Sequence, residues 1–173
     1  MSATDDGDNP GPMPLSGHAQ VVAGAPRLDE IGLENFAPYL MNRIMGRYNA
    51  ALQAEMTEQG LTTPQMRSLA VLSVTDGILI RELSVYAVVQ QSTLSRALDA
   101  LDQNGLIRRE ADGQDSRATR VFLTDAGRHA YERLWPHMAA AYEAMMKGIG
   151  EGEKNAFVAT LQTILRNIRK HDF

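Results

Sequence analysis

The stretch from residue 79 to residue 124 constrains the fold more than any other part of the chain. Its clearest feature is a predicted helix whose apolar residues recur at the spacing that gathers them on one side, Leu94, Ala97, Leu98 and Leu101. The opposite side carries short hydroxyl groups and one guanidinium, from Ser92, Thr93, Ser95 and Arg96. Asn104 and Gly105 end the helix, since both tolerate the left-handed backbone found just past a helix C-terminus. The pattern therefore predicts one buried face and one polar, solvent-facing side.

A hairpin is predicted directly after this helix. Its strands are Ile107–Ala111 and Thr119–Leu123, and residues 112–116 between them have the composition of a turn. Thr124 is the predicted N-cap of a following helix. A helix, a turn, a second helix, a hairpin and a further helix, in this order, form a winged helix.

Long helices are predicted on both sides of this unit. Between residues 31 and 59 apolar residues step by three and four, and Pro38 lies where the regular helix begins. Thr62-Thr63-Pro64 starts another helix, with a hydroxyl N-cap and a proline in the first helical position. Residues 125–147 are predicted to be helical, with a kink near Leu134 caused by Pro136. The last helix carries an apolar stripe, Phe157, Leu161, Ile164, Leu165 and Ile168. We therefore expect a mainly α fold with a small β-hairpin wing.

The turn before the amphipathic helix departs from the usual pattern. The preceding helix is predicted over residues 80–88, and tight turns between two such helices often contain Gly. This chain instead has Val88, Val89, Gln90 and Gln91 there. The turn geometry and the first residue of the next helix are left open by the sequence.

Three segments carry a resemblance to a known family. These are Ser92-Thr93-Leu94-Ser95-Arg96, residues 104–109, and above all Asp115-Ser116-Arg117 followed after five residues by Leu123-Thr124-Asp125-Ala126-Gly127. They resemble the MarR family of bacterial transcriptional regulators, over roughly residues 33–170. The resemblance implies a winged helix-turn-helix flanked by long dimerisation helices, and a homodimer that binds double-stranded DNA.

Charge separates the N-terminus from the rest of the chain. Residues 1–30 hold five acids and one Arg, a net charge of −4, whereas residues 31–173 hold sixteen charges of each sign. We expect a flexible acidic tail over 1–30, a helical dimerisation region over 31–60 and 125–173, and a DNA-binding lobe over 61–124. Residues 90–120 contain five Arg and five acids, so only three-dimensional geometry can produce a basic patch there.

The predicted DNA contacts lie on the amphipathic helix and on the wing. The helix would enter the major groove through Gln91, Ser92, Thr93, Ser95 and Arg96, and Arg96 could donate two hydrogen bonds to a guanine. In the wing, Arg117 would reach a minor groove while Asp115 holds it in place. The candidate phosphate contacts are Arg108, Arg109 and Arg120. The alternatives are an ordinary solvated helix face, a surface ion pair of little energetic value, and arginines that neutralise Glu110 or Asp112.

A ligand pocket is implied by the resemblance, because family members commonly bind a small, often aromatic anion between the dimerisation helices and the DNA-binding lobe. The residues predicted to line it are Tyr39, Met41, Arg43, Met45, Tyr48 and Met66, with Arg43 pairing the acid. Aromatic and methionine residues at helical spacing also suit an ordinary core, so this alternative stays open.

Several classes of protein are disfavoured by composition. The chain has no Cys, which removes disulfides, thiolate metal sites and thiol nucleophiles. No metal site or cofactor is predicted, because the His and Glu residues between 129 and 143 lack a metal-ligand spacing. No apolar run approaches the ~20 residues of a membrane span, so we expect a cytoplasmic protein. An enzyme is disfavoured because no catalytic constellation appears.

The function predicted from these features is that of a homodimeric repressor. It would bind a pseudo-palindromic operator and be released by a small, aromatic anionic ligand. A ligand-independent repressor, an activator, and a winged-helix module that binds protein instead of DNA are the alternatives.

Overall fold

The computed structural model describes residues 24–168. Contacts group these residues into two units: Gly32–Met145 forms the larger one, and the described residues on either side of it, 24–31 and 146–168, form the smaller one. Residues 1–23, most of the predicted acidic tail, lie outside the described residues. None of the helices within residues 24–168 has both the length and the apolar character needed to cross a bilayer.

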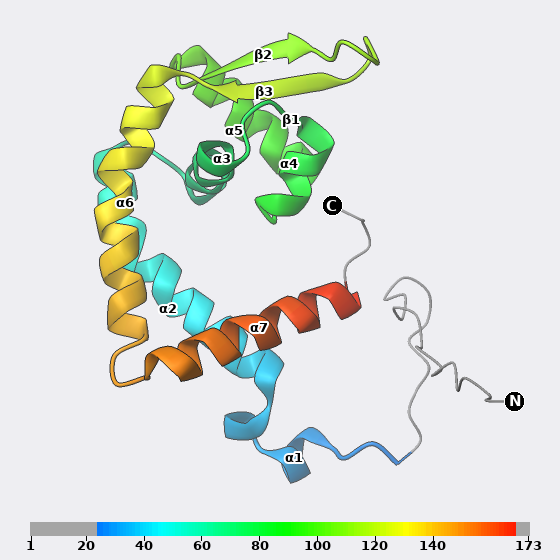
Figure 1. Cartoon of the computed structure of the whole chain (residues 1–173), viewed down its shortest axis with the longest axis vertical. Helices are drawn as coiled ribbons and strands as arrows, with labels where there is room; N and C mark the ends of the chain where they lie inside the picture. The colour runs from blue at the N-terminus through cyan, green and yellow to red at the C-terminus, as the bar shows by residue number, and fades with distance from the viewer. Residues whose placement is uncertain (1–23, 169–173) are drawn as a thin grey trace, which may run out of the picture. The chain divides into compact units, whose positions relative to one another are not determined.

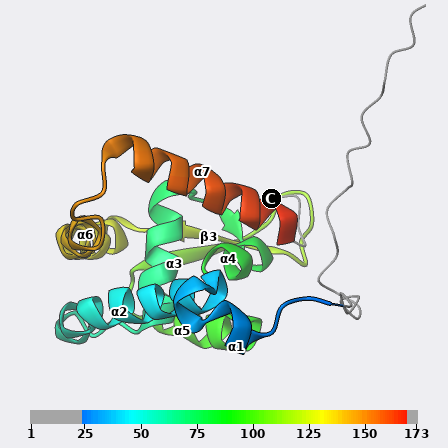
Figure 2. The ribbon, with the colours of Figure 1, turned by 90° about the horizontal axis from the view of Figure 1, so that it is seen from below.

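The winged helix forms as predicted, with one additional strand. Its helices are α3 (Thr63–Val74), α4 (Ile80–Tyr86) and α5 (Gln91–Gln103), and its strands are β1 (Ile78–Leu79), β2 (Ile107–Ala111) and β3 (Thr119–Leu123). The strands form one antiparallel sheet in the order β1-β3-β2. Figures 1 and 2 show the three helices gathered beside this sheet.

Strand β1 was not predicted, because it consists of two residues and leads straight into α4. Ile78 pairs with Val121 and Leu79 pairs with Arg120, so β1 forms the edge of the sheet next to β3. A strand this short has no period that can be read from sequence. It is formed by pairing with a strand more than 40 residues further along the chain.

The core of the winged helix confirms the amphipathic character of α5. Leu94, Ala97, Leu98 and Leu101 are all buried. The three leucines pack in one cluster with residues of α3, α4 and the sheet, including Leu69, Leu72, Leu83, Ile107 and Val121. Burial of these side chains removes apolar surface from water and is the main term that stabilises the lobe.

Two long helices belong to the same unit as the winged helix. α2 (Ala37–Glu58) begins with Pro38 in its first turn, as predicted, but residues 31–36 do not continue it, because a short 3-10 helix, η1 (Leu33–Asn35), precedes it. α6 (Asp125–Met145) lies beside α2, and both contribute to a second cluster of Leu52, Met56, Met66 and Leu134 (Figure 1). Pro136 lies inside α6 and does not divide it.

The smaller unit contains two described helices. α1 (Leu28–Ile31) is a single turn, and α7 (Glu151–Ile168) is the predicted last helix. Glu153 accepts a hydrogen bond from the backbone N–H of Gly150 at 2.9 Å and so supports the first turn of α7. Phe157, Leu165 and Ile168 of the predicted apolar stripe are exposed.

Candidate nucleic-acid interface

The polar side of α5 is presented to solvent. The side chains predicted to enter the major groove are all exposed, Gln91, Ser92, Thr93, Ser95 and Arg96. The helix begins at Gln91, and Gln90 is its N-cap without a side-chain hydrogen bond. The first turns of α5 therefore offer free hydroxyl, amide and guanidinium groups on a helix whose other side is fixed in the core.

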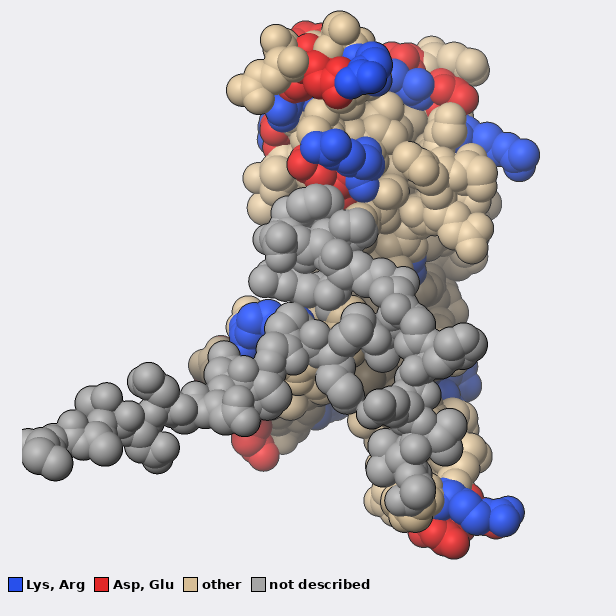
Figure 3. Space-filling view, turned by 90° about the vertical axis from the view of Figure 1, so that its right-hand side faces the viewer, with Lys and Arg blue, Asp and Glu red and all other residues tan. Residues whose placement is uncertain are grey.

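Nearly all charged side chains of residues 90–120 form ion pairs with one another. Four arginines pair with all five acids of this stretch: Arg108 with Glu110, Arg109 with Asp99 and Asp102, Arg117 with Asp115, and Arg120 with Asp112. Arg96 has no acidic partner among the described residues. Figure 3 shows the result, with basic and acidic side chains interspersed at the end of the lobe that holds the sheet. Arg96, on the exposed side of α5, is therefore the one arginine of residues 90–120 without an ion pair in the described part of the chain.

The wing tip carries the arginine that the sequence singled out. Arg117 is 90% exposed, and its Nε lies 3.2 Å from Asp115 Oδ1. The same carboxylate oxygen accepts the backbone N–H of Arg117 at 3.0 Å. Asp115 thus orients an arginine that remains accessible to a phosphate or a groove.

A polar groove lies between the wing and the helices. It has a volume of about 310 Å³, and its lining includes Gln91 of α5, Arg117 and Thr119 of the wing, and Arg81 of α4. Sequence reasoning missed Arg81, which is exposed and has no acidic partner among the described residues. The position of the wing relative to α4 is what brings Arg81 to this groove, and local sequence carries no signal of that position.

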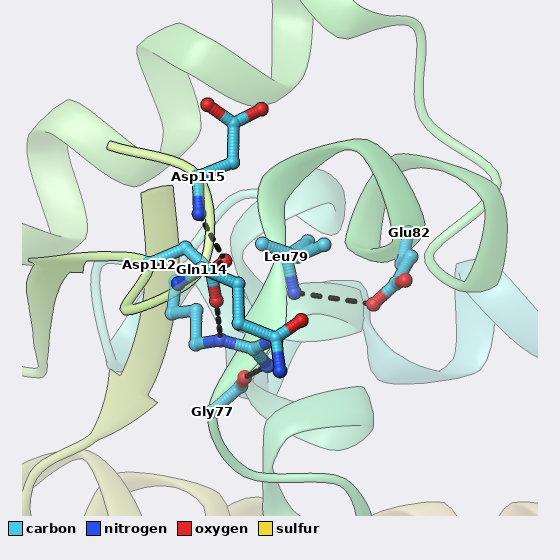
Figure 4. Close-up of polar contacts among 7 residues, drawn as sticks. Gly77, Leu79, Glu82, Asp112, Gln114 and Asp115 are labelled. Carbon is cyan, nitrogen blue, oxygen red and sulfur yellow. Dashed lines mark hydrogen bonds and ion pairs between the residues drawn. The ribbon is translucent and has the colours of Figure 1, made fainter. Parts of the chain in front are cut away.

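Arg120, which the sequence predicted to contact phosphate, has two partners within the protein. Its guanidinium forms an ion pair with Asp112 through Nε and donates from Nη1 to the carbonyl oxygen of Gly77 at 2.7 Å (Figure 4). Arg108 likewise pairs with Glu110 and lies over the Phe122 ring, with its guanidinium carbon 4.1 Å from the ring centre. The alternative in which these arginines neutralise Asp112 and Glu110 is the arrangement present in the structure.

The Asp112 carboxylate is held in its charged form. The Arg120 guanidinium is the largest cause that lowers the pKa of Asp112, and the backbone N–H groups of Asp115 and Gln114 lower it further. Burial acts in the opposite direction but does not outweigh these hydrogen bonds. Asp112 therefore stays ionised at neutral pH.

A second, mostly apolar cavity of about 410 Å³ lies on the α2, α3 and α6 side of the lobe. Three residues predicted for the pocket, Met45, Tyr48 and Met66, line this cavity. The other lining residues are Asn49, Arg67, Ala70, Val71, Tyr86, Ala87, Val88 and Met138. Tyr39 and Arg43 do not line it. They contact each other instead, with a hydrogen bond of 3.2 Å from Arg43 Nη1 to the Tyr39 hydroxyl.

The cavity has one cationic side chain and one phenol with an altered pKa. Arg67 of α3 donates from Nη1 to the backbone carbonyl of Val88 at 3.4 Å. Burial raises the pKa of the Tyr48 hydroxyl, and the neighbouring Tyr131 adds to the same direction. Tyr48 therefore stays neutral near pH 7 and keeps a proton to donate.

The histidines of α6 do not form a metal-binding group. His137 lies 3.1 Å from a Glu55 carboxylate oxygen across the contact of α6 with α2. Within residues 24–168 no three His, Cys, Asp or Glu side chains gather closely enough to hold a metal ion.

The helix, the wing and the groove between them define a winged-helix DNA-binding protein. A family model described as MarR family matches residues 59–118. A crystal structure of a MarR-family transcriptional regulator from Silicibacter pomeroyi is 59% identical, covers 86% of this chain and 100% of that chain, and has a TM-score of 0.82. This chain therefore belongs to the MarR family of transcriptional regulators.

Two further similar proteins are more distant. The HTH-type transcriptional repressor IacR of Pseudomonas putida is 25% identical over 143 residues, which are 83% of this chain and 86% of IacR. A structure of BpsR from Bordetella bronchiseptica is 23% identical, covers 73% of this chain and 96% of that chain, and has a TM-score of 0.64. That structure concerns the regulation of BpsR's DNA binding by 6-hydroxynicotinic acid.

Proposed function

We propose that this regulator binds DNA by placing the first turns of α5 in the major groove and the wing tip against the adjacent backbone or minor groove. The observation that carries the proposal is that Arg96 is the arginine of residues 90–120 left without an acidic partner, on the exposed side of α5. A guanidinium in this position can donate two hydrogen bonds to the O6 and N7 acceptors of guanine. Ser92, Thr93 and Ser95 supply shorter donors for bases or phosphates.

The functional unit is a homodimer. α2 and α7 expose large apolar side chains, such as Leu40, Ile44 and Leu165. Burial of these side chains against a second copy of the chain would favour self-association. A two-fold axis would present two α5 helices to half-sites about one DNA turn, ~34 Å, apart, which requires a pseudo-palindromic operator. Bound at a promoter, the dimer acts as a repressor, as the name of IacR states for that relative.

The cavity supports release by a small, aromatic anionic ligand. Its lining is largely apolar, which suits an aromatic ring, while Arg67 can pair a carboxylate and Tyr48 can donate a hydrogen bond. The BpsR structure, whose subject is an aromatic acid that regulates DNA binding, is a fold neighbour with the same type of effector. A ligand that binds more tightly to a dimer with the wrong helix spacing would lower operator affinity.

The experiment for DNA binding is a titration of a fluorescent duplex from the chain's own upstream region, compared with a random duplex over a range of salt concentrations. Wild type should bind its upstream region specifically and lose affinity steeply with salt, and Arg96→Ala should lose most of the preference for that duplex. Arg133→Ala, which removes an exposed arginine from the middle of α6, is the control. It should change neither the preference for the upstream duplex nor the salt dependence of binding. Equal binding of both duplexes, together with an empty genome-wide selection for bound fragments, would overturn the proposal.

The effector is tested with benzoate and benzyl alcohol, which differ in charge but share the ring. Millimolar benzoate should weaken operator binding and benzyl alcohol should not, because only the acid can pair with Arg67. Arg67→Met should abolish this difference while leaving operator binding in the absence of benzoate intact. If benzoate weakens operator binding by Arg67→Met as much as it does for wild type, the carboxylate binds at a site other than Arg67.

A further inference from the structure

Arg120 connects two parts of the lobe that are far apart in sequence. Its Nε pairs with Asp112, at the end of β2, and its Nη1 donates to Gly77, in the loop before β1, at 2.7 Å. The Arg120 side chain is 39% exposed, and that of Asp112 is 8% exposed. Two of the five N–H donors of this guanidinium are therefore bound by groups of the protein before any DNA arrives.

Asp112 links Arg120 to the wing loop, residues 112–118 between β2 and β3. Its Oδ2 accepts the backbone N–H of Gln114 at 3.1 Å and that of Asp115 at 3.0 Å. The Asp112 N–H in turn donates to the Ala118 carbonyl at 2.9 Å, which closes the loop. Figure 4 shows Asp112 beside Gln114 and Asp115, with the Gly77 carbonyl nearby. One carboxylate therefore determines where the backbone of Asp115 lies.

The last contacts lead to the exposed arginine at the wing tip. Asp115 Oδ1 accepts both the backbone N–H and the Nε of Arg117, at 3.0 and 3.2 Å. A continuous path of hydrogen bonds and ion pairs thus runs from Gly77 through Arg120, Asp112 and Asp115 to Arg117.

The inner end of this path is held rigidly. Gly77 has a φ of 71°, and the site of a Cβ on it is filled by the Phe122 ring, so the loop is closely packed against the sheet. The Asp76 carboxylate accepts the Leu123 N–H at 2.7 Å, and Glu82 accepts the Leu79 N–H at 3.3 Å at the start of α4. Arg120 therefore ties the wing loop to a segment that is fixed both to β3 and to α4.

We propose that Arg120 and Asp112 are positioning residues, which set the wing loop so that Arg117 is arranged for DNA before binding, and that Arg120 itself does not contact phosphate. This inference rests on the proposed DNA-binding function. Ordering a loop in advance lowers the entropy cost of association, so a wing held in place binds more tightly than a wing that must be ordered on the DNA. The path assigns Arg120 an indirect role in place of the phosphate contact predicted from sequence.

Salt dependence distinguishes a positioning residue from a phosphate contact. Loss of one phosphate contact reduces the slope of log K against log salt concentration by about 0.9, whereas loss of a positioning residue weakens binding without removing a contact. Arg120→Met should therefore lower operator affinity by about tenfold, the size of a coupled network contribution, and keep the wild-type slope. Asp112→Asn keeps the shape of the side chain and should act in the same way.

A double-mutant cycle provides the second readout. Arg117→Ala should weaken binding on its own, but in the Arg120→Met background it should cost clearly less, because Arg117 is then no longer held in place. Arg108→Met, which removes a paired arginine of β2 outside this path, is the matched control and should be additive with Arg117→Ala. Additive effects of Arg120→Met and Arg117→Ala, with a slope reduced by about 0.9, would show that Arg120 contacts phosphate and would overturn the proposal.

Amide hydrogen exchange tests the positioning without DNA. In Arg120→Met and Asp112→Asn the Gln114 and Asp115 amides should exchange faster than in wild type, while core amides such as that of Leu98 keep their protection. Unchanged exchange at both wing amides would overturn the proposal even if DNA binding falls. If wild type fails to bind DNA, the proposed function fails, and the exchange rates still report whether Arg120 holds the wing.

Discussion

The absence of a side chain at Gly127 allows α6 to pack closely against the backbone of Leu106, just before β2. Gly127 lies in the first turn of α6, where its N–H donates to the Thr124 hydroxyl at 3.0 Å and confirms Thr124 as the N-cap. A Cβ on Gly127 would overlap the carbonyl oxygen of Leu106 and lie 2.9 Å from Leu123 Cδ1. The position where a capping box would have Glu is therefore restricted to Gly by backbone packing.

Gly127→Ala should consequently destabilise the lobe by about 3 kcal/mol, the cost of overpacking against backbone that cannot move aside. Gly46→Ala is the matched control, because Gly46 lies in α2 with nothing within 4 Å of its Cβ site. The control should stabilise the protein by roughly 0.5–1 kcal/mol, the difference in helix propensity. Urea unfolding measures both changes, and equal effects of the two substitutions would contradict the packing argument.

Asp112 should make the stability of the protein depend on pH in a characteristic way. Since the Arg120 guanidinium and the wing amides lower its pKa, its contribution to stability is fully present above the usual Asp pKa of about 4 and is lost as the pH falls through the lowered value. Asp112→Asn should therefore be less stable than wild type by a constant amount between pH 5 and 8. The difference should shrink at more acidic pH, as urea unfolding at a series of pH values would show. A difference that grows on acidification would exclude this assignment.

At the scale of elements, the turn between α4 and α5 carries backbone strain. Val88 has a φ of 53° and is 77% exposed, so a β-branched residue occupies the left-handed conformation where Gly is usual. The sequence showed that Gly was absent from this turn, and the structure shows that the turn keeps its left-handed geometry nonetheless. The Val88 carbonyl accepts the Arg67 hydrogen bond, and the side chain lines the apolar cavity.

Val88→Gly should stabilise the protein by about 1 kcal/mol, because relief of the left-handed conformation, roughly 1–2 kcal/mol, exceeds the entropy cost of Gly. Val74→Gly serves as the control: Val74 is equally exposed, and its backbone does not have a positive φ. That substitution should destabilise by roughly 0.5–1 kcal/mol. Thermal unfolding compares the two variants, and a lower melting temperature for Val88→Gly would show that the turn is not strained.

For the whole molecule, the proposed homodimer would place two α5 helices at one operator. Ile44→Glu in α2 and Leu165→Glu in α7 place a charge on exposed apolar residues and should each weaken self-association at least tenfold, since burial of an unpaired carboxylate costs several kcal/mol. Thr163→Glu, an exposed polar position of α7, should have little effect. Sedimentation velocity over a concentration series measures this, and full dimerisation of both apolar variants would place the interface elsewhere.

Much of the lobe could be predicted from the sequence because its signals are local. The buried side of α5, both strands of the hairpin and the Thr124 cap follow from spacing and turn chemistry within a few residues. The exposure of Arg96 followed as well, since Leu94, Ala97 and Leu98 require the opposite side of the helix to face water.

What only the tertiary structure decided involves partners that are distant in sequence. Strand β1 exists through pairing with β3, Arg120 reaches the Gly77 carbonyl 43 residues away, and the cavity takes Arg67 instead of Arg43 as its cation. Local periodicity determines which side of an element faces inward, but it carries no information about which element lies opposite. The sequence alone predicted a winged helix with a polar α5 face, whereas the packing of strands and helices left Arg96 without an acidic partner among residues 24–168 and joined Arg120 to Asp112 and Gly77.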